Sequence, residues 1–321
     1  MRVGIVAPSG VVPKIEFQEG VAKLSGSGFE AVVHPQCFCQ HLFYAGTDEE
    51  RSRAFYESAS DPSLDIIWAA RGGYGATRIL PWLEKMTEFH GIPKHKLFVG
   101  YSDATALMAY VKDRWGWSTL HAPMPGVGEF SKITPANWST LLSFLNKRQE
   151  KFSKKLNFLE KKPSKPIIGE VVGGNLAVIA SMVGTPFALD AKNKILFLEE
   201  VSEAPYRIDR FVQQLAWGGS FEGVKAIVLG TFSDCDDIVF DVLADRKTGK
   251  KKPLRAKVNL ERSLEDIFGF VEDSFGIPIA MGLSVGHGGG NLPLPLGAQY
   301  KLSKDGDFEL SKWSWLSTRQ R

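Results

Sequence analysis

The sequence has little cysteine and no long apolar run. Three cysteines occur in 321 residues, and Cys37 and Cys39 form a C-x-C pair that is too close for an ordinary disulfide. The longest weakly polar stretch, LAVIASMVGTPFAL, is shorter than a membrane span and contains Gly184 and Pro186. These absences predict reduced thiols, no disulfide framework and no transmembrane helix.

An excess of charge of either sign is also missing. Lysine and arginine together number 39, and aspartate and glutamate 36, which gives a formal net charge of +3. This balance gives no reason to expect nucleic acid or another polyanion as a partner. The opening residues, MRVGIVAPSG, pass directly from a strand-like run to a turn and lack the pattern of a secretion signal. We therefore expect a cytoplasmic protein without nucleic-acid or membrane partners.

The first part of the chain alternates apolar runs with helical patterns. The strand-like runs RVGIVAP, LDIIWAA and KLFVG are followed by helical periodicity at residues 14–27, 76–89 and 103–114. A βα-repeat of this kind predicts a parallel sheet covered by helices, in an α/β fold of flavodoxin-like type.

A basic stretch, RQEKFSKKLNFLEKKPSKP, divides the chain into two parts and is interpreted as an interdomain linker. We expect an N-terminal domain at 1–130, a helix and basic linker at 131–166, and a C-terminal α/β domain rich in β-structure at 167–321. Strand candidates in this last domain are KILFLEE, AIVLG and IPIAMGL, and helices are expected at about 175–183 and 206–216.

Three predicted strands of the first part end in turns of small residues: APSG, ARGGYGA and GYSD. The carboxyl ends of parallel strands share one edge of a sheet, so these turns are expected to converge there. Gly72, Gly73 and Gly75 permit positive φ and leave peptide N–H groups uncovered for an anion or oxyanion, and Arg71 adds a cation. The same residues also fit a tight turn without a ligand. Their spacing matches neither the dinucleotide-binding nor the P-loop pattern.

The stretch GYSDA at 100–104 partly matches the nucleophile elbow G-x-S-x-G, with Ala104 in place of the last glycine. A serine at such a turn has its hydroxyl exposed above the sheet, close to a helix N-terminus that favours negative charge. Ser102 or Asp103 would equally serve to cap the following helix. The stretch alone supports a nucleophile and a helix cap equally.

A nucleophilic serine needs a base and an acid that orients it. Of six histidines, His287 lies in GLSVGHGGGNLPLPLG, where glycines would leave the imidazole accessible, although an isolated histidine is more often structural. His121 fits better as a core or pocket-lining residue. In KILFLEE, strand alternation places Glu199 and Glu200 on opposite faces, so only one of them faces a given site. Strand alternation does not decide which of the two glutamates faces the site.

Five motifs together resemble the serine LD-carboxypeptidases, a family that includes microcin C self-immunity hydrolases. The motifs are RGGYGATRIL, GYSDATAL, GGNLAVIASMVGTP, ILFLEEVSEAPYRIDRFVQQL and GLSVGHGGGNLPLPLG, in the order of the family and over most of the chain. The resemblance implies a triad of Ser102 as nucleophile, His287 as general base and Glu199 as orienting acid. It also implies acyl transfer through an acyl-enzyme, at a site between the two domains.

The resemblance further implies a murein tetrapeptide substrate, cut between the L-centre of its diamino acid and the terminal D-alanine, and a homodimer with no cofactor and no metal. The backbone N–H groups of Gly73 and Asp103 are expected to hold the oxyanion. Arg71 and Asn175 are candidates for substrate contact, with a salt bridge and a helix cap as their structural alternatives. The charged segment 233–261 is longer than in simpler members.

Two other functions stay open. One is an immunity-type amidase that cleaves a peptidyl-nucleotide conjugate. The other is a non-catalytic peptide-binding protein that keeps the glycine turns without turnover.

Overall fold

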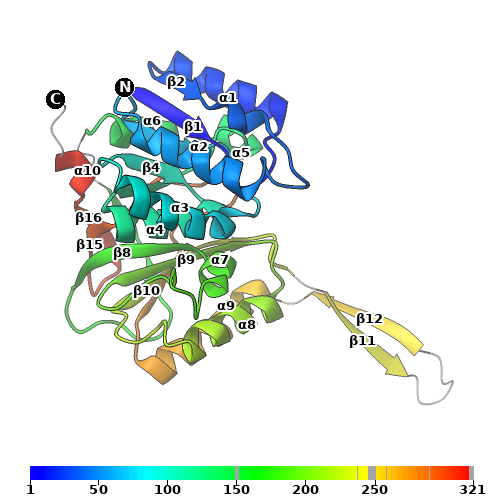
Figure 1. The fold of residues 1–321 in the computed structure, drawn as a ribbon. Coiled ribbons are helices and arrows are strands. Elements are labelled where there is room, and N and C mark those ends of the chain that lie inside the picture. Colours follow the sequence, from blue (N-terminus) through cyan, green and yellow to red (C-terminus); the bar gives the residue numbers. More distant parts are fainter. Residues whose placement is uncertain (149–151, 237, 245–250, 258, 289, 318–321) are drawn as a thin grey trace.

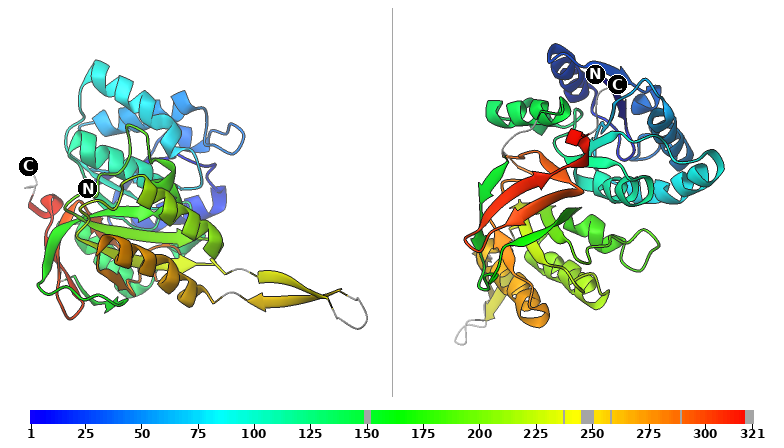
Figure 2. Two further views of the ribbon diagram at one scale, coloured as in Figure 1. Left: turned by 90° about the horizontal axis from the view of Figure 1, so that it is seen from below. Right: turned by 90° about the vertical axis from the view of Figure 1, so that its left-hand side faces the viewer.

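Two β-sheets, one above the other in Figure 1, organise the chain. The computed structural model describes residues 1–148, 152–236, 238–244, 251–257, 259–288 and 290–317. Both sheets contain parallel strands flanked by helices, which confirms the predicted α/β fold class. Two views at right angles show the N-terminal sheet and its helices on one side of the second sheet and further helices on the other side (Figure 2).

The N-terminal sheet has the strand order β14-β5-β4-β3-β1-β2. Its parallel strands are β1 (Arg2–Val6), β2 (Glu30–Val33), β3 (Ile66–Ala69), β4 (Leu97–Gly100) and β5 (Ser118–His121). The order 2-1-3-4-5 is that of flavodoxin-like folds, as expected. At one edge, β14 (Leu294–Leu296) returns from the C-terminal part and pairs antiparallel with β5.

Helices cover this sheet and connect its strands. They are α1 (Lys14–Gly26), α2 (Asp48–Ser60), α3 (Ala76–His90), α4 (Thr105–Trp115), α5 (Gly128–Ser131) and α6 (Pro135–Leu145), with short 3-10 turns η1 (Pro35–Phe38) and η2 (Ser102–Ala104). Helix α2 packs beside α3, and α3 beside α4. The predicted helices at 14–27, 76–89 and 103–114 are thus confirmed with small shifts of their ends.

Helix α2 was not predicted from the sequence, although a capping box marks its start. The Thr47 hydroxyl accepts from Glu50 N at 3.2 Å, and Glu50 Oε2 accepts from Thr47 N at 2.8 Å. This T-x-x-E pattern satisfies two backbone donors that the first helical turn would otherwise leave unpaired. Hydrophobic periodicity alone did not show the helix because its residues are mostly polar.

The C-terminal sheet has eight strands in the order β6-β16-β15-β8-β9-β10-β13-β7. They are β6 (Ser153–Lys155), β7 (Asn157–Phe158), β8 (Ile167–Asn175), β9 (Ile195–Val201), β10 (Ala226–Ser233), β13 (Ile279–Met281), β15 (Ala298–Leu302) and β16 (Asp307–Lys312). The segment interpreted as a linker thus supplies the two edge strands β6 and β7. Residues 149–151 of that segment lie outside the described residues.

Helices α7 (Leu176–Ser181), α8 (Pro205–Trp217) and α9 (Leu260–Phe275) accompany the C-terminal sheet, and α10 (Ser314–Ser317) follows its last strand. The helices expected near 175–183 and 206–216 are confirmed as α7 and α8. Helix α9 was not predicted, although Asn259 caps its start and Gly276 ends it in the left-handed conformation.

The two faces of β9 belong to different hydrophobic cores. Ile195 and Phe197 pack into the core shared with the N-terminal sheet. Leu196 and Leu198 pack into a second core with residues of α7, α8 and α9. Because side chains alternate along a strand, the residues after Leu198 also face opposite sides.

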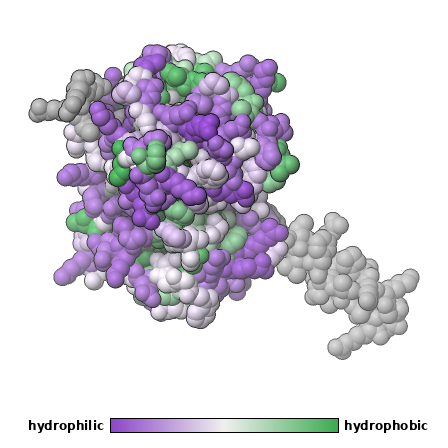
Figure 3. All heavy atoms as spheres, viewed as in Figure 1, coloured by the Kyte–Doolittle hydropathy of each residue, from purple (hydrophilic) through white to green (hydrophobic). Residues whose placement is uncertain are grey.

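The outer surface seen in Figure 3 is largely hydrophilic, with scattered apolar residues. Across the residues described, no helix is both long enough and apolar enough to span a membrane. All three cysteines are free thiols, as expected from their number and spacing.

Strands β11 (Ile238–Ala244) and β12 (Lys251–Lys257) form an antiparallel hairpin that projects from the body (Figures 1 and 2). They pair with each other and with no strand of the two larger sheets in the part of the chain that the structure describes. The charged segment 233–261 therefore contains this hairpin. The segment also contains the end of β10 and the start of α9.

The hairpin is expected to contribute little to the stability of the body. Replacing residues 238–257 by a short glycine-serine linker should change the free energy of unfolding by less than about 1 kcal/mol, since loop length alone has a weak effect. Phe268→Ala, in the buried face of α9, should cost about 3–5 kcal/mol in the same urea titration. A deletion as costly as Phe268→Ala would show that the hairpin supports the fold.

Candidate active site

The turn after β4 holds Ser102 in an unusual backbone conformation. Its φ is +61°, a region that residues with a Cβ rarely adopt. The buried strand β4 ends at Gly100, and η2 and α4 follow the serine directly. A Cβ on Gly100 would lie 2.8 Å from the Ala104 Cβ, so the turn closes tightly on its small residues. Such a strained strand-to-helix turn is typical of a nucleophile elbow.

Neither Ser102 nor Asp103 caps the helix that follows. Helix α4 begins without a side-chain cap, and so does the η2 turn before it. Asp103 Oδ2 instead accepts from Ala76 N, at 2.8 Å, at the start of α3. Burial raises the pKa of Asp103, while hydrogen bonds and the Arg51 charge act in the opposite direction. Asp103 thus links the turn at Ser102 to the glycine turn beside it and does not cap α4.

The three small-residue turns converge as predicted. Gly10 N donates to Gly72 O at 3.0 Å, which joins the turns after β1 and β3. A Cβ on Gly72 would lie 2.9 Å from Ser102 Oγ, so glycine is required where the turn passes Ser102. The next residue, Gly73, is exposed and has a φ of +98°. The glycine turn therefore lies directly against Ser102.

The base and its partner come from the C-terminal sheet and the loop after β13. Glu199 is fully buried, and its Oε2 accepts from His287 Nδ1 at 2.7 Å and from His287 N at 3.2 Å. A proton on Nδ1 leaves Nε2 as the acceptor nitrogen of a neutral imidazole. Glu200 faces the other side of the strand, where it accepts from Asn175 Nδ2 and Ala177 N, each at 2.8 Å. The structure thus pairs His287 with Glu199.

The electrostatics of this pair suit a general base. Burial disfavours the Glu199 carboxylate, but the His287 hydrogen bond and two nearby imidazoles hold its pKa to about 2. The second imidazole is His121, whose Nε2 lies 3.9 Å from Glu199 Oε1, beyond hydrogen-bond range. Burial lowers the pKa of His287, but the bond and charge of Glu199 outweigh it and raise that pKa above its ordinary value. The result is an ionised acid beside a strengthened base.

Comparisons with known protein families cover both parts of the chain. Models of the LD-carboxypeptidase N-terminal and C-terminal domains match residues 3–122 and 168–302. A Bacillus subtilis protein named probable murein peptide carboxypeptidase is 30% identical over 94% of this chain and 88% of its own length. The chain belongs to the LD-carboxypeptidase family.

Two further relatives cover nearly the whole chain. The crystal structure of muramoyltetrapeptide carboxypeptidase from Oxalobacter formigenes has a TM-score of 0.72 and 31% identity, over 97% of this chain and 98% of that one. The microcin C7 self-immunity protein MccF of Escherichia coli is 26% identical over 98% of this chain and 93% of its own length. The resemblance seen in the five motifs is confirmed, and the protein is a serine-type peptidase.

Two residues of the candidate site were not identified from the sequence. The Tyr101 ring lies 4.7 Å from the His287 ring, centroid to centroid, and its hydroxyl donates to Glu129 Oε2 at 2.6 Å. Glu129 Oε1 accepts from Gly288 N at 3.2 Å. Tyr101 is part of the motif GYSD and could have been considered there. No sequence motif surrounds Glu129, because its contacts are made with a loop that is distant in sequence. Together they tie the histidine loop to the N-terminal sheet.

The two candidates for substrate contact are engaged within the protein. Asn175 Oδ1 accepts from Val178 N at 3.1 Å and caps α7, which is the structural alternative expected for this residue. The Arg71 guanidinium donates to the carbonyl of Val11. Their contact with substrate stays a prediction, as do the oxyanion contacts of Gly73 and Asp103.

Gly286 is expected to be essential for the acid-base pair. Its φ is +126°, and a Cβ there would lie 2.8 Å from Glu199 Oε2. Gly286→Ala should therefore displace the carboxylate and remove most peptidase activity. Gly282→Ala is a matched control, because Gly282 also has a positive φ, +98°, and its Cβ would meet no described atom within 4 Å. Each change should cost about 1–3 kcal/mol of stability through backbone strain.

Both variants are compared by urea unfolding and by peptide hydrolysis. Equal activity of Gly286→Ala and Gly282→Ala would contradict the requirement for close approach at Glu199.

Proposed function

We propose that this LD-carboxypeptidase hydrolyses the amide bond between the L-centre of the diamino acid and the terminal D-alanine of murein tetrapeptides. The observation that carries the proposal is the 2.7 Å bond from His287 to the buried Glu199. The His287 ring lies 4.7 Å from the ring of Tyr101, the residue before Ser102 on its strained turn. The likeness to relatives named for murein peptides supports the choice of substrate.

The reaction uses Ser102, His287 and Glu199 as a triad. His287 Nε2 takes the proton of the serine hydroxyl as Oγ attacks the amide carbon, and Glu199 stabilises the imidazolium that forms. The tetrahedral intermediate collapses when His287 returns this proton to the leaving nitrogen, and D-alanine departs. Water, deprotonated by His287, then attacks the acyl carbon, and the ester bond to Ser102 Oγ breaks. His287 returns the proton to Oγ, and the tripeptide is released.

Backbone N–H groups of Gly73 and Asp103 hold the oxyanion in this mechanism. The position of the glycine turn against Ser102 supports this role. Arg71 and Asn175 remain the candidates for the terminal carboxylate. Arg71 would give up its bond to Val11, and Asn175 would give up its bond to the buried Glu200.

The proposal includes action on recycled murein peptides in the cytoplasm, by a homodimer that needs no cofactor and no metal. Sedimentation equilibrium of the purified chain tests the dimer. A second candidate reaction is amide cleavage in a peptidyl-nucleotide conjugate, which the likeness to the microcin self-immunity protein favours. The same triad would attack that amide, and the two substrates differ in the leaving group that cleavage releases.

The purified protein should release D-alanine from a murein tetrapeptide, and Ser102→Ala should release none while remaining folded. Release is followed by amino-acid analysis, and folding by circular dichroism. If the folded wild-type protein leaves the tetrapeptide intact, the proposal is wrong. A peptidyl-nucleotide conjugate assayed in parallel distinguishes the amidase, and binding without cleavage of either substrate indicates a non-catalytic peptide-binding protein.

Glu199→Gln and Glu200→Gln form a matched pair that separates catalysis from stability. Glu199→Gln should lower kcat by roughly 10³–10⁴-fold, because an amide no longer fixes the tautomer or stabilises the imidazolium. Glu200→Gln should instead destabilise the fold by about 1–3 kcal/mol through its hydrogen bonds to α7, with kcat largely retained. Similar kcat losses in both variants would contradict the assignment of Glu199.

The pH profile of the wild type gives a further check. The base must be neutral, so kcat/KM should rise with pH through the pKa of His287, which Glu199 raises above about 6.5. In Glu199→Gln the same limb should move to lower pH, because the charge that favours the imidazolium is gone. An unmoved limb would mean that another group titrates.

A further inference from the structure

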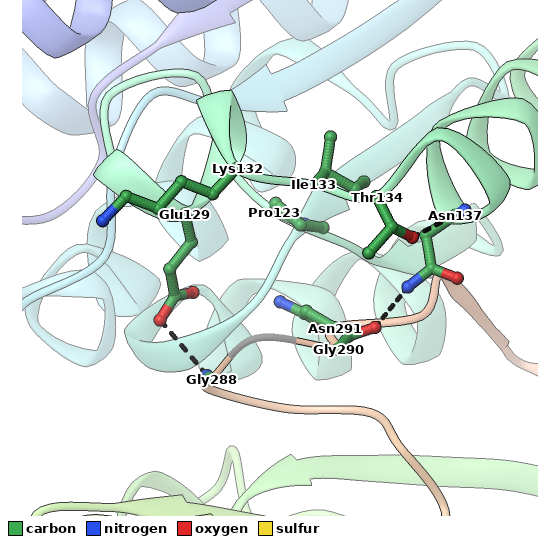
Figure 4. A pocket seen from close by; sticks show the side chains of 9 residues that line it. All are labelled: Pro123, Glu129, Lys132, Ile133, Thr134, Asn137, Gly288, Gly290 and Asn291. Atoms are coloured by element: carbon green, nitrogen blue, oxygen red, sulfur yellow. Dashed lines mark hydrogen bonds between the residues drawn. The ribbon is translucent and has the colours of Figure 1, made fainter.

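The two sides of the candidate site are fixed by groups of opposite charge. On the histidine side, the Glu129 carboxylate accepts from Gly288 N at 3.2 Å, the contact drawn as a dashed line in Figure 4. On the serine side the charged group is the guanidinium of Arg51, on α2, which has no exposed surface. No step of the proposed reaction uses Arg51.

The Arg51 guanidinium is compensated on all sides. A charge removed from water is costly unless it is paired and hydrogen-bonded. Asp48, at the start of the same helix, forms an ion pair with Arg51 Nη2, and the centroid of the Tyr44 ring lies 4.8 Å from Arg51 Cζ. Arg51 Nε donates to Gly46 O, in the loop before α2, at 3.3 Å. These contacts hold the guanidinium in one position.

The remaining donor, Arg51 Nη1, joins two of the turns that converge at the candidate site. It donates to Gly75 O, in the glycine turn, at 2.8 Å, and to Pro8 O, in the turn after β1. A Cβ on Gly75 would lie 2.7 Å from Nη1, so the guanidinium lies directly against the glycine turn. One buried side chain therefore sets the distance between these two turns.

The orientation of the proposed oxyanion donor depends on the same two turns. Gly72 O accepts from Gly10 N at 3.0 Å. The peptide bond between Gly72 and Gly73 is trans, so its N–H, which is that of Gly73, points away from Gly10. Pro8, whose carbonyl Arg51 binds, lies two residues before Gly10. A shift of the turn after β1 would therefore also turn the Gly73 N–H.

The end of the glycine turn has a second anchor. Next to the bond from Arg51 to Gly75 O, Asp103 Oδ2 accepts from Ala76 N at 2.8 Å. Burial raises the pKa of Asp103, and the Arg51 charge acts in the opposite direction, so the arginine favours the ionised carboxylate. Arg51 thus supports the turn both through its own bond and through Asp103.

We propose that Arg51 is a positioning residue that fixes the glycine turn, so that the Gly73 N–H meets the negative charge that develops on the substrate. Donors that are fixed in advance need no rearrangement when this charge forms. A lysine would not be equivalent, because its compact ammonium lacks the planar fork of the guanidinium. The inference rests on the proposed function, since that function requires an oxyanion site.

The test compares Arg51→Lys with Arg78→Gln. Arg51→Lys keeps the charge but loses the fork, so kcat for the murein tetrapeptide should fall by about 10–10²-fold with KM largely unchanged. Arg78 also pairs with Asp48, at 2.6 Å, and its Cζ lies 5.6 Å from the centroid of the Tyr44 ring. Within the described part of the chain it donates to no carbonyl of the two turns. Arg78→Gln should therefore keep the wild-type kcat.

Hydrogen exchange separates positioning from a general loss of stability. Exchange of the backbone amides at 72–76 is followed by mass spectrometry, with the buried strand β9 as the internal reference. In Arg51→Lys the exchange at 72–76 should become faster while that of β9 does not change. A change that only destabilises the protein would speed exchange in both segments. Arg78→Gln should exchange like the wild type.

The outcomes keep this inference apart from the proposed function. If the wild type cleaves the tetrapeptide and folded Arg51→Lys keeps its kcat, the role of Arg51 is overturned and the carboxypeptidase assignment stands. If the wild type leaves the peptide intact, the proposed function fails, and exchange at 72–76 decides whether Arg51 fixes the turn. Selective acceleration in Arg51→Lys supports this role, and an unchanged rate overturns it in either case.

Asp48→Asn replaces Arg51→Lys if urea unfolding shows that the latter does not fold. It leaves Arg51 in the chain but removes the charge that pairs with the guanidinium. A lower kcat together with faster exchange at 72–76 supports the inference, and wild-type values of both overturn it.

Discussion

An ionised carboxylate with no exposed surface is the constraint on which the site depends. Burying the Glu199 charge is costly unless it is paired and hydrogen-bonded, and removal of one partner would leave that cost uncompensated. His287 compensates with both its ring and its backbone N–H. The loop after β13 must therefore approach β9 closely, which a glycine at 286 permits. Thr231 Oγ1 secures the loop from the other side by donating to His287 O at 2.8 Å.

The candidate site also requires the two sheets to keep a fixed position relative to each other. Ser102 belongs to the N-terminal sheet, whereas Glu199 and His287 belong to the C-terminal part. Asn175 N, at the end of β8, donates to the Thr105 hydroxyl of α4 at 3.0 Å. A Cβ on Gly174 would lie 2.5 Å from that hydroxyl oxygen, so the strand and the helix meet with no room between them. Soon after His287, β14 joins the N-terminal sheet, with Leu294 opposite His121.

The features that could be predicted from the sequence are those set by short-range rules. The turns after β1, β3 and β4 were identified because parallel strands bring their ends to one edge, a rule that needs no tertiary detail. The choice between Glu199 and Glu200 needed the family resemblance, because strand alternation shows only that the two side chains lie on opposite faces of the strand. The structure gives the physical difference between the two glutamates. Phe197 and Glu199 share the face toward the N-terminal sheet, while Leu198 and Glu200 face α7 and α8.

The residues that the sequence did not reveal depend on contacts between distant segments. Glu129 and Gly288 lie far apart in the chain and meet only because the histidine loop packs against the α5–α6 segment. No spacing rule marks such residues. Helix α2 was missed for a different reason, since the capping box at Thr47 and Glu50 was present but the helix lacks a clear apolar stripe.

The turn at Ser102 leaves the start of the following helix without a side-chain cap. A positive φ at Ser102 costs roughly 1–3 kcal/mol and persists only because the surroundings fix it. Asp103 helps to fix this conformation, because its side chain accepts a hydrogen bond from the start of α3 rather than from the helix that follows it. As a consequence, no side chain of the turn occupies the N–H groups at the start of α4. The positive end of that helix is therefore available to a negatively charged group beside Ser102.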